Sequence, residues 1–141
     1  MEYYIFAGSP PHGVRLAEYN PAWPAAFSLE CTRIRAALGD LTAEIEHVGS
    51  TSVPGLIAKP VIDMLVGRPA DSDAAPYIDA LQSLEYEYRG ESGIPGRHYF
   101  RRGRPHTHHL HLVEHGGTLW WDHLRFRDRL RADSALVTEY A

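Results

Sequence analysis

Residues 41–67 read LTAEIEHVGSTSVPGLIAKPVIDMLVG, and this stretch carries the clearest information about the architecture. Its first part alternates apolar and polar side chains like a half-buried strand, in which Ile45 and His47 share a face. Its last part, VIDMLVG, is an apolar run interrupted only by Asp63, which predicts a central strand covered on both faces. A lone carboxylate in such a strand is costly unless it has a partner, so Asp63 is the first candidate functional residue.

A turn of small residues, Gly49-Ser50-Thr51-Ser52, connects the two predicted strands and is followed by Lys59. Small residues let backbone N–H groups approach an anion closely, and serine and threonine hydroxyls add donors. We therefore expect these four residues and Lys59 to bind phosphate, the alternative being a turn without a ligand. The stretch lacks the Gly-Lys-Thr or Gly-Lys-Ser of a Walker loop and the glycine spacing of a dinucleotide-binding loop, so neither is predicted.

Outside this stretch, the sequence predicts the helices and strands of an α+β (mixed α/β) domain with helices packed on one sheet. Apolar periodicity and turn residues predict helices over residues 24–38, 71–88 and 120–141, and strands around residues 98–102 and 108–114. Residues 1–16 are aromatic and then rich in glycine and proline, which predicts an N-terminal arm or edge strand. We expect residues 17–141 to form a single domain.

Histidines are concentrated in one short segment, at His106, His108, His109, His111 and His115. In a strand, the side chains of His109 and His111 leave on the same face. Two imidazoles about 7 Å apart on one face can bind a metal, hold a phosphate or relay a proton. The alternative is a histidine-rich, partly solvated strand without such a role.

A basic segment precedes the histidines, with Tyr99 and Phe100 interleaved among Arg97, Arg101, Arg102 and Arg104. A local cluster of guanidinium groups on an acidic protein can hold the phosphates of a small ligand. The alternative is an exposed basic edge strand that protects against aggregation.

The 141 residues include 18 acidic and 14 basic side chains, for a formal net charge of -4, which argues against a broad nucleic-acid surface. Among the basic residues only Lys59 is a lysine, so that position calls for an explanation. The single cysteine, Cys31, cannot form an internal disulfide, and no apolar run is long enough to span a membrane. We therefore expect a cytoplasmic protein without membrane contact.

Together with YNPAWPAAF at residues 19–27 and HLRFRDRLRAD at residues 123–133, these motifs resemble the GrpB family. That family comprises small bacterial proteins of the nucleotidyltransferase-like superfamily. The resemblance covers the chain from about residue 17 onward, in consistent order. It implies a small mixed sheet flanked by helices, with the Gly49-Ser50 turn opening onto a nucleotide phosphate.

The resemblance also implies a metal site, because active members of the superfamily carry two carboxylates, separated by one residue, that hold two divalent ions. Here Asp63 matches the first carboxylate, but Leu65 stands at the second position. Two interpretations follow. In the first, one divalent ion, Zn²⁺ or Mn²⁺ in preference to Mg²⁺, is held by His47, Asp63, His109 and His111. In the second, no metal binds, and Asp63 pairs with Lys59 or a histidine as an acid/base group or an anion clamp.

The expected function is that of a nucleotidyltransferase-like protein, a transferase if active, that binds a nucleotide or another phosphorylated small molecule. The expected phosphate-binding residues are Gly49, Ser50, Thr51, Ser52, Lys59 and Arg101, and the expected catalytic residues are Asp63, His109 and His111. One alternative is a non-catalytic accessory or binding subunit that works with a protein partner or as a homodimer, and Leu65 favours it. Another is a pocket recruited to a different small-molecule biosynthetic reaction.

Overall fold

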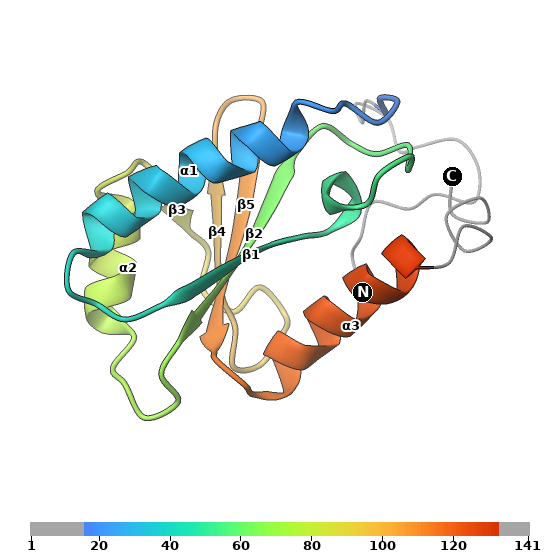
Figure 1. Ribbon diagram of the computed structural model, residues 1–141. Helices are drawn as coiled ribbons and strands as arrows, with labels where there is room; N and C mark the ends of the chain where they lie inside the picture. Colours follow the sequence, from blue (N-terminus) through green and yellow to red (C-terminus); the bar gives the residue numbers. More distant parts are fainter. Residues whose placement is uncertain (1–15, 133–141) are drawn as a thin grey trace.

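The computed structural model describes residues 16–132, which form a five-stranded sheet with helices on both of its faces (Figure 1). In chain order the elements are α1 (Trp23–Leu38), β1 (Glu44–Val48), the 3-10 helix η1 (Ser50–Ser52), β2 (Ile62–Arg68), α2 (Ala75–Gln82), β3 (Glu87–Tyr88), β4 (His98–Arg102), β5 (His108–Glu114) and α3 (Thr118–Ala132). The predicted α+β class, a small mixed sheet flanked by helices, is confirmed.

The sheet has the strand order β1-β2-β5-β4-β3, so β2 and β5 occupy its interior. These two strands run parallel, and all other neighbours are antiparallel. Every residue of β2 is buried, which confirms the prediction of a central strand around Asp63. A parallel pair needs a long crossover, and residues 69–107 provide it with α2, β3 and β4.

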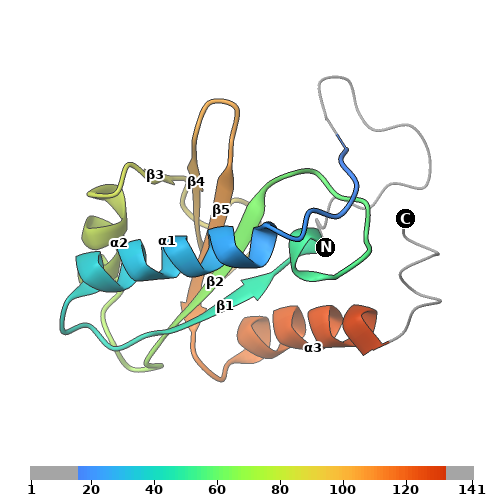
Figure 2. The ribbon, with the colours of Figure 1, turned by 45° about the horizontal axis from the view of Figure 1, so that its top comes forward.

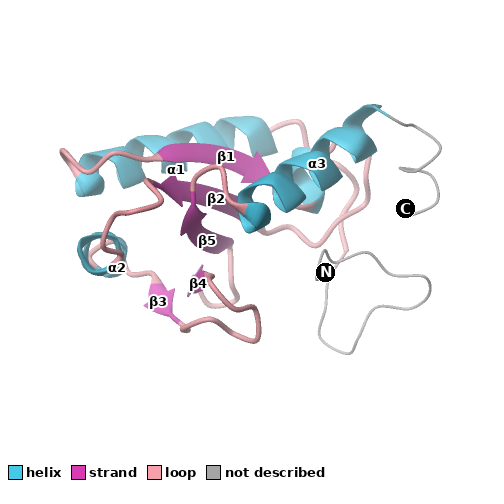
Figure 3. Ribbon diagram, turned by 90° about the horizontal axis from the view of Figure 1, so that it is seen from below, coloured by secondary structure: helices cyan, strands magenta, loops and turns pink. Residues whose placement is uncertain are grey.

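Two different layers cover the sheet: α1 and α2 pack on one face and α3 packs on the other (Figure 2 and Figure 3). On the face that α1 and α2 cover, which we call the α1–α2 face, the central strands supply a continuous apolar core through Ile62, Met64, Val66, Leu110 and Leu112. Side chains alternate along a strand, so the residues next to these in the sequence point to the opposite face, which we call the α3 face. Asp63 and His109 are among them.

The apolar core of the α3 face is much smaller. It consists of Val48, Leu65, Val113 and Trp120. At Gly67, a Cβ would lie 2.8 Å from the Trp120 ring, so the absence of a side chain there lets α3 approach the sheet. The face also buries charged and polar groups, among them Asp63 and His111.

The second helix is shorter than its sequence pattern predicts, since α2 ends at Gln82 rather than near residue 88. Glu85 has a φ of +70°, a backbone conformation that no right-handed helix contains. The chain turns there, and the Tyr86 hydroxyl donates a hydrogen bond of 2.6 Å to buried Glu30 on α1. A tertiary contact therefore replaces the final helical turn.

Most of the expected N-terminal arm, residues 1–16, lies outside the described residues, as does the last part of the helix predicted over residues 120–141. The single domain over residues 17–141 stays a prediction. None of the helices within residues 16–132 has the length and apolar character needed to cross a membrane.

Candidate functional site

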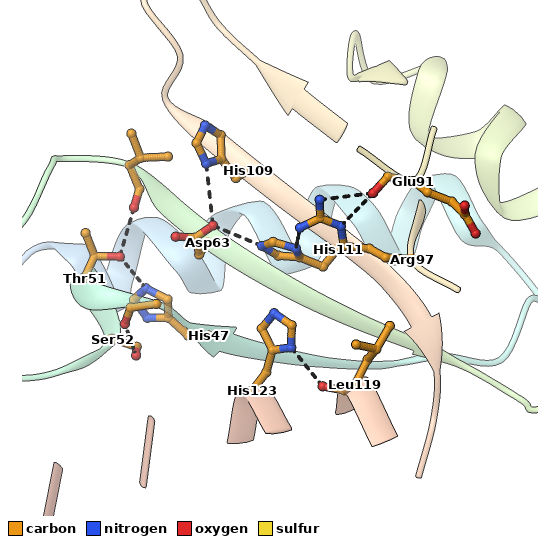
Figure 4. A network of polar contacts seen from close by, with 12 residues as sticks. His47, Thr51, Ser52, Asp63, Glu91, Arg97, His109, His111, Leu119 and His123 are labelled. Carbon is orange, nitrogen blue, oxygen red and sulfur yellow. Dashed lines mark hydrogen bonds and ion pairs between the residues drawn. The ribbon is translucent and has the colours of Figure 1, made fainter. Parts of the chain in front are cut away.

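Asp63 lies at the centre of the polar part of the α3 face, and the imidazoles of β5 lie beside it (Figure 4). His111 Nε2 is 3.3 Å from Asp63 Oδ1, and His109 Nδ1 is 3.7 Å from the same oxygen. All three side chains are buried. The structure thus brings together the three residues that the sequence predicts as catalytic.

The strand register explains why these side chains meet. In the parallel pair β2–β5, Asp63 lies opposite His109 and Leu65 lies opposite His111. In the antiparallel pair β4–β5, Arg101 lies opposite His109, so it shares the α3 face, and Tyr99 lies opposite His111 in the same way. The Tyr99 ring contacts both imidazoles, with ring centroids 5.6 Å from His109 and 5.3 Å from His111.

Arg97, just before β4, is buried behind His111 with only 1% of its surface exposed. Its guanidinium donates to the carbonyl oxygens of Glu91 and Ser92 and lies over the Tyr99 ring, 4.5 Å from the centroid. Arg97 Nη1 is also 3.3 Å from His111 Nδ1. A guanidinium only donates, so His111 Nδ1 accepts. His111 is then the neutral Nε2–H tautomer and donates to Asp63 Oδ1.

His109 and His123 surround this pair with further uncharged imidazoles. Burial lowers the pKa of His109 to about 4, against the opposing effect of the Asp63 carboxylate. Burial likewise lowers the pKa of His123, on α3, to about 4. The ring of His123 lies 4.9 Å from that of His111, and its Nδ1 is 2.8 Å from the Leu119 carbonyl oxygen. Both groups are neutral at pH 7.

The turn after β1 packs directly against the Asp63 carboxylate. Gly49 has a φ of +73°, and a Cβ there would lie 2.4 Å from Asp63 Oδ2. Thr51 donates to the Val61 carbonyl, and Ser52 donates to the Gly49 carbonyl at 2.6 Å. The hydroxyls of Thr51 and Ser52 therefore hold the turn itself.

Ser50 differs from its two neighbours in the turn. Its residue is 1% exposed, and its Oγ is buried without a hydrogen-bond partner within the part of the chain that the structure describes. A buried hydroxyl without a partner costs free energy that a ligand can recover. Of the three predicted hydroxyl groups, Ser50 is the one with spare capacity for a phosphate oxygen.

The structure places His47 on the other face of the sheet, away from the Asp63 cluster. It lies opposite Met64 in the β1–β2 pair, whereas Asp63 lies opposite Val48. Its ring stacks on Phe27 of α1 at 4.9 Å, and its Nε2 is 2.9 Å from Thr51 Oγ1. Burial and the charges of two α3 arginines lower its pKa to about 4.

His47 also lines an open groove of about 590 Å³ between α1 and α3, together with Phe27, Ser52, Arg127 and Arg131. Arg127 Nη1 donates to Glu46 Oε1 at 2.6 Å, and Arg131 Nε donates to the Ser52 carbonyl at 2.9 Å. Asp63 is not among the residues that line this groove, so His47 contributes to a different surface.

Lys59 and Arg101 lie at the rim of the Asp63 cluster, where both residues are half-buried. The Lys59 ammonium is close enough to lower the pKa of His109, and Lys59 and Arg101 both contribute to a lowered pKa of His106. Arg101 Nε is buried without a hydrogen-bond partner among residues 16–132. Two cationic side chains therefore flank the approach to a buried carboxylate.

These residues, as arranged, do not fit the predicted divalent metal. Leu65 is fully buried among Val48, Val113 and Trp120, where no second carboxylate ligand exists. Both ring nitrogens of His111 are engaged, by Arg97 and by Asp63. Across residues 16–132 no group of three His, Cys, Asp or Glu side chains is arranged to hold a metal ion.

Arg97, Tyr99 and His123 belong to the cluster, although the sequence predicts Arg97 only as part of a phosphate-holding basic segment and assigns no role to Tyr99 or His123. Arg97, Tyr99 and Arg101 are spaced by two residues, which places them on one face of an extended segment. That alternation was a usable signal. His123 had a weaker one, since it lies three residues after Trp120 on the buried stripe of α3.

With this geometry established, comparison with known proteins identifies the family. The family model described as GrpB protein matches residues 13–141. The chain belongs to the GrpB family. The UPF0157 protein YqkA of Bacillus subtilis is 37% identical over 138 residues, which are 97% of this chain and 40% of that protein. The chain therefore spans well under half the length of YqkA.

A solved structure agrees with the GrpB assignment, and a second one shares the fold. The conserved protein GrpB from Enterococcus faecalis has a TM-score of 0.80 and 38% identity, covering 89% of this chain and 78% of that one. The Cid1 poly(U) polymerase has a TM-score of 0.59 at 12% identity, covering 85% of this chain and 40% of that one. This GrpB chain therefore shares a fold with a nucleotide polymerase, a likeness that at such low identity concerns the fold alone.

Proposed function

We propose that the α3 face binds a nucleotide or another phosphorylated small molecule. The observation that carries this proposal is the pair of rim cations, Lys59 and Arg101, flanking the buried Asp63 cluster on a chain whose net charge is -4. Guanidinium and ammonium groups hold phosphate oxygens through charge-assisted hydrogen bonds. Because Asp63 itself is buried, the phosphate would bind at the rim, next to Lys59 and Arg101.

The turn after β1 supports the same location. Ser50 Oγ is the buried hydroxyl left over once Thr51 has bonded to Val61 and Ser52 to Gly49. A phosphate oxygen would accept from it. The fold shared with a nucleotide polymerase agrees with a phosphorylated ligand, although it does not identify one.

Group transfer is a more specific prediction than ligand binding. In a transfer reaction the attacking hydroxyl oxygen would bond to phosphorus as the bond to the leaving phosphate breaks, Asp63 would accept the hydroxyl proton beside neutral His109, and Lys59 and Arg101 would neutralise the leaving phosphate. The competing candidate is a non-catalytic binding subunit, and one observation favours it. Leu65, at the position of the second carboxylate of active superfamily members, is sealed in an apolar cluster. Binding is common to both candidates and is therefore tested first.

The test measures the thermal stability of the chain with ATP and with inorganic pyrophosphate as probes. A probe at about 100 times its Kd would raise the free energy of unfolding by about 2.7 kcal/mol. Replacing Lys59 or Arg101 by Gln removes a charged hydrogen bond, so we expect each change to weaken binding about tenfold. We expect Ser50→Ala to weaken it about threefold, the effect of one neutral hydrogen bond.

Arg129→Gln is the matched control, because Arg129 is an exposed arginine on α3. We expect that variant to bind both probes like the original chain. If neither probe stabilises the protein, or if Lys59→Gln and Arg129→Gln respond alike, the phosphate site is not where we propose it.

A further inference from the structure

A continuous chain of contacts links a buried cation to a buried carboxylate through one imidazole. Arg97 Nη1 donates to His111 Nδ1 at 3.3 Å, and His111 Nε2 donates to Asp63 Oδ1 at 3.3 Å. Arg97 is held by the Glu91 and Ser92 carbonyls, so it cannot turn away without breaking three further hydrogen bonds. His111 is therefore locked in one tautomer with both nitrogens occupied.

This arrangement conflicts with metal coordination. An imidazole binds a metal through a nitrogen lone pair, and the lone pair of neutral His111 points at Arg97. A metal at Asp63 would need to displace the Nε2–H group of His111. It would then be separated from the Arg97 guanidinium only by the His111 ring. The neighbouring position that could supply a second carboxylate is Leu65, directly opposite His111 in the sheet.

The charges around the site also oppose a divalent cation. Lys59 lies close to His109, Arg97 close to His123, and Arg101 opposite His109, so three cations surround Asp63, with Glu87 opposite Arg101 as a further carboxylate, while His109 and His123 are neutral. Sites for two divalent ions need an excess of carboxylates instead. A surplus of positive charge suits a phosphate directly.

We propose that this site binds its phosphate ligand without a divalent metal ion, with Arg97 as the positioning residue that fixes His111 on Asp63. The choice of phosphate as the ligand rests on the proposed function. The contacts that join Arg97, His111 and Asp63 do not depend on it. In this metal-free site, Lys59 and Arg101 take over the charge neutralisation that metal ions provide in a two-metal site.

Asp63→Asn should change the affinity for phosphate in opposite directions in a site with a metal and in a site without one. In a metal-bridged site the carboxylate holds the ion that holds the phosphate, so Asp63→Asn would weaken phosphate binding at least tenfold. In a site without metal the carboxylate repels the phosphate, so Asp63→Asn tightens binding. We expect a factor of about three, because solvent screens much of the repulsion between the two charges. Asparagine keeps an oxygen that accepts from His111 Nε2.

The binding experiment titrates ATP and inorganic pyrophosphate into the original chain and Asp63→Asn, with EDTA or with added Mg²⁺, Mn²⁺ or Zn²⁺. We expect the affinity of the original chain to be the same with EDTA as with each metal, and tighter pyrophosphate binding by Asp63→Asn. Affinity that requires a metal and is lost in Asp63→Asn would overturn the proposal.

A second experiment needs no phosphate ligand. Long-range ¹H–¹⁵N correlation spectra of the imidazoles report which nitrogen of His111 carries the proton. We expect Nε2–H for His111, and no change when Mn²⁺ or Zn²⁺ is added. In Arg97→Met, which removes the donor, we expect a mixture of His111 tautomers, whereas Arg104→Met, at a side chain 79% exposed, leaves the His111 resonances unchanged.

The two experiments separate the possible failures. If neither ATP nor pyrophosphate binds, the proposed function fails, and the spectra still test the arrangement of His111. An Nδ1–H tautomer in the original chain, or a metal that binds His111 directly, would contradict the inference even if phosphate binds.

Discussion

On β5, Leu110 and His109 are neighbours in the chain and lie on opposite faces of the sheet. Leu110 joins the apolar core under α1 and α2, whereas His109 joins the polar cluster around Asp63. β2 divides in the same way between Met64 and Asp63. The two strands thus supply the part of the core that lies on the central sheet with one set of side chains and the candidate site with the other, so stability and binding should be separable by neighbouring substitutions.

The largest effect should follow from a cavity on the α1–α2 face. Leu110 is fully buried, so we expect Leu110→Ala to lower the free energy of unfolding by about 3 to 4 kcal/mol. The neighbouring change His109→Gln should cost only about 1 kcal/mol, because glutamine keeps a polar side chain in the cluster and leaves little cavity. Urea unfolding of both variants measures the two values. Equal losses would mean that the faces do not divide stability from binding.

A somewhat smaller effect is expected on the α3 face itself, at Gly49. A Cβ there would lie 2.4 Å from Asp63 Oδ2 on a backbone with a φ of +73°, so Gly49→Ala should cost about 2 to 3 kcal/mol and displace the carboxylate. Gly39→Ala is the control, because Gly39 also has a positive φ but no atom within 4 Å of its Cβ position. We expect that variant to lose only about 1 kcal/mol. Thermal and urea unfolding compare the pair, and equal losses would show that strain alone, without the clash, explains the glycine.

The smallest effect, when it is expressed per pH unit, is the dependence of stability on pH. The folded-state pKa values of His47, on the α1–α2 face, and His109, on the α3 face, are lowered to about 4 from a usual value of 6.5. Between pH 6.5 and 4 the unfolded chain therefore binds more protons than the folded one, and stability falls as the pH falls through this window. Each histidine should contribute a slope of about 1.4 kcal/mol per pH unit.

Replacing either histidine by Gln should lower the number of protons taken up on unfolding by about one, and the slope of stability against pH falls accordingly. Urea unfolding at pH 7, 6 and 5 measures that slope. His115→Gln, at an exposed side chain, is the control and should leave the slope unchanged. A slope unaffected by both His47→Gln and His109→Gln would show that these imidazoles are not buried as neutral groups.

The sequence predicts the strands better than it predicts the meeting of their side chains. The apolar run around Asp63 and the alternation of His109 with Leu110 are local signals, and both strands form as expected. Their parallel pairing across residues 69–107 is a tertiary feature that no local pattern contains. Alternation alone therefore placed His109 and His111 on one face but could not place that face at Asp63.

His47 shows the complementary failure. Its alternation was interpreted correctly, yet its grouping with Asp63 depended on the register between β1 and β2. A shift of one residue exchanges the faces, and the register sets Val48, not His47, opposite Asp63. The burial of Arg97 could not be predicted either, because nothing in a basic segment distinguishes the arginine that will be buried from those that will be exposed.

Chemical-shift mapping of the isotope-labelled chain with inorganic pyrophosphate is the most direct test of phosphate binding on the α3 face. We expect the resonances of Ser50, Lys59, Arg101 and His109 to shift with a single saturating affinity, while Leu110 and Met64 stay unchanged. Shifts confined to His47, Arg127 and Arg131, which line the groove between α1 and α3, or no saturable shifts at all, would contradict it.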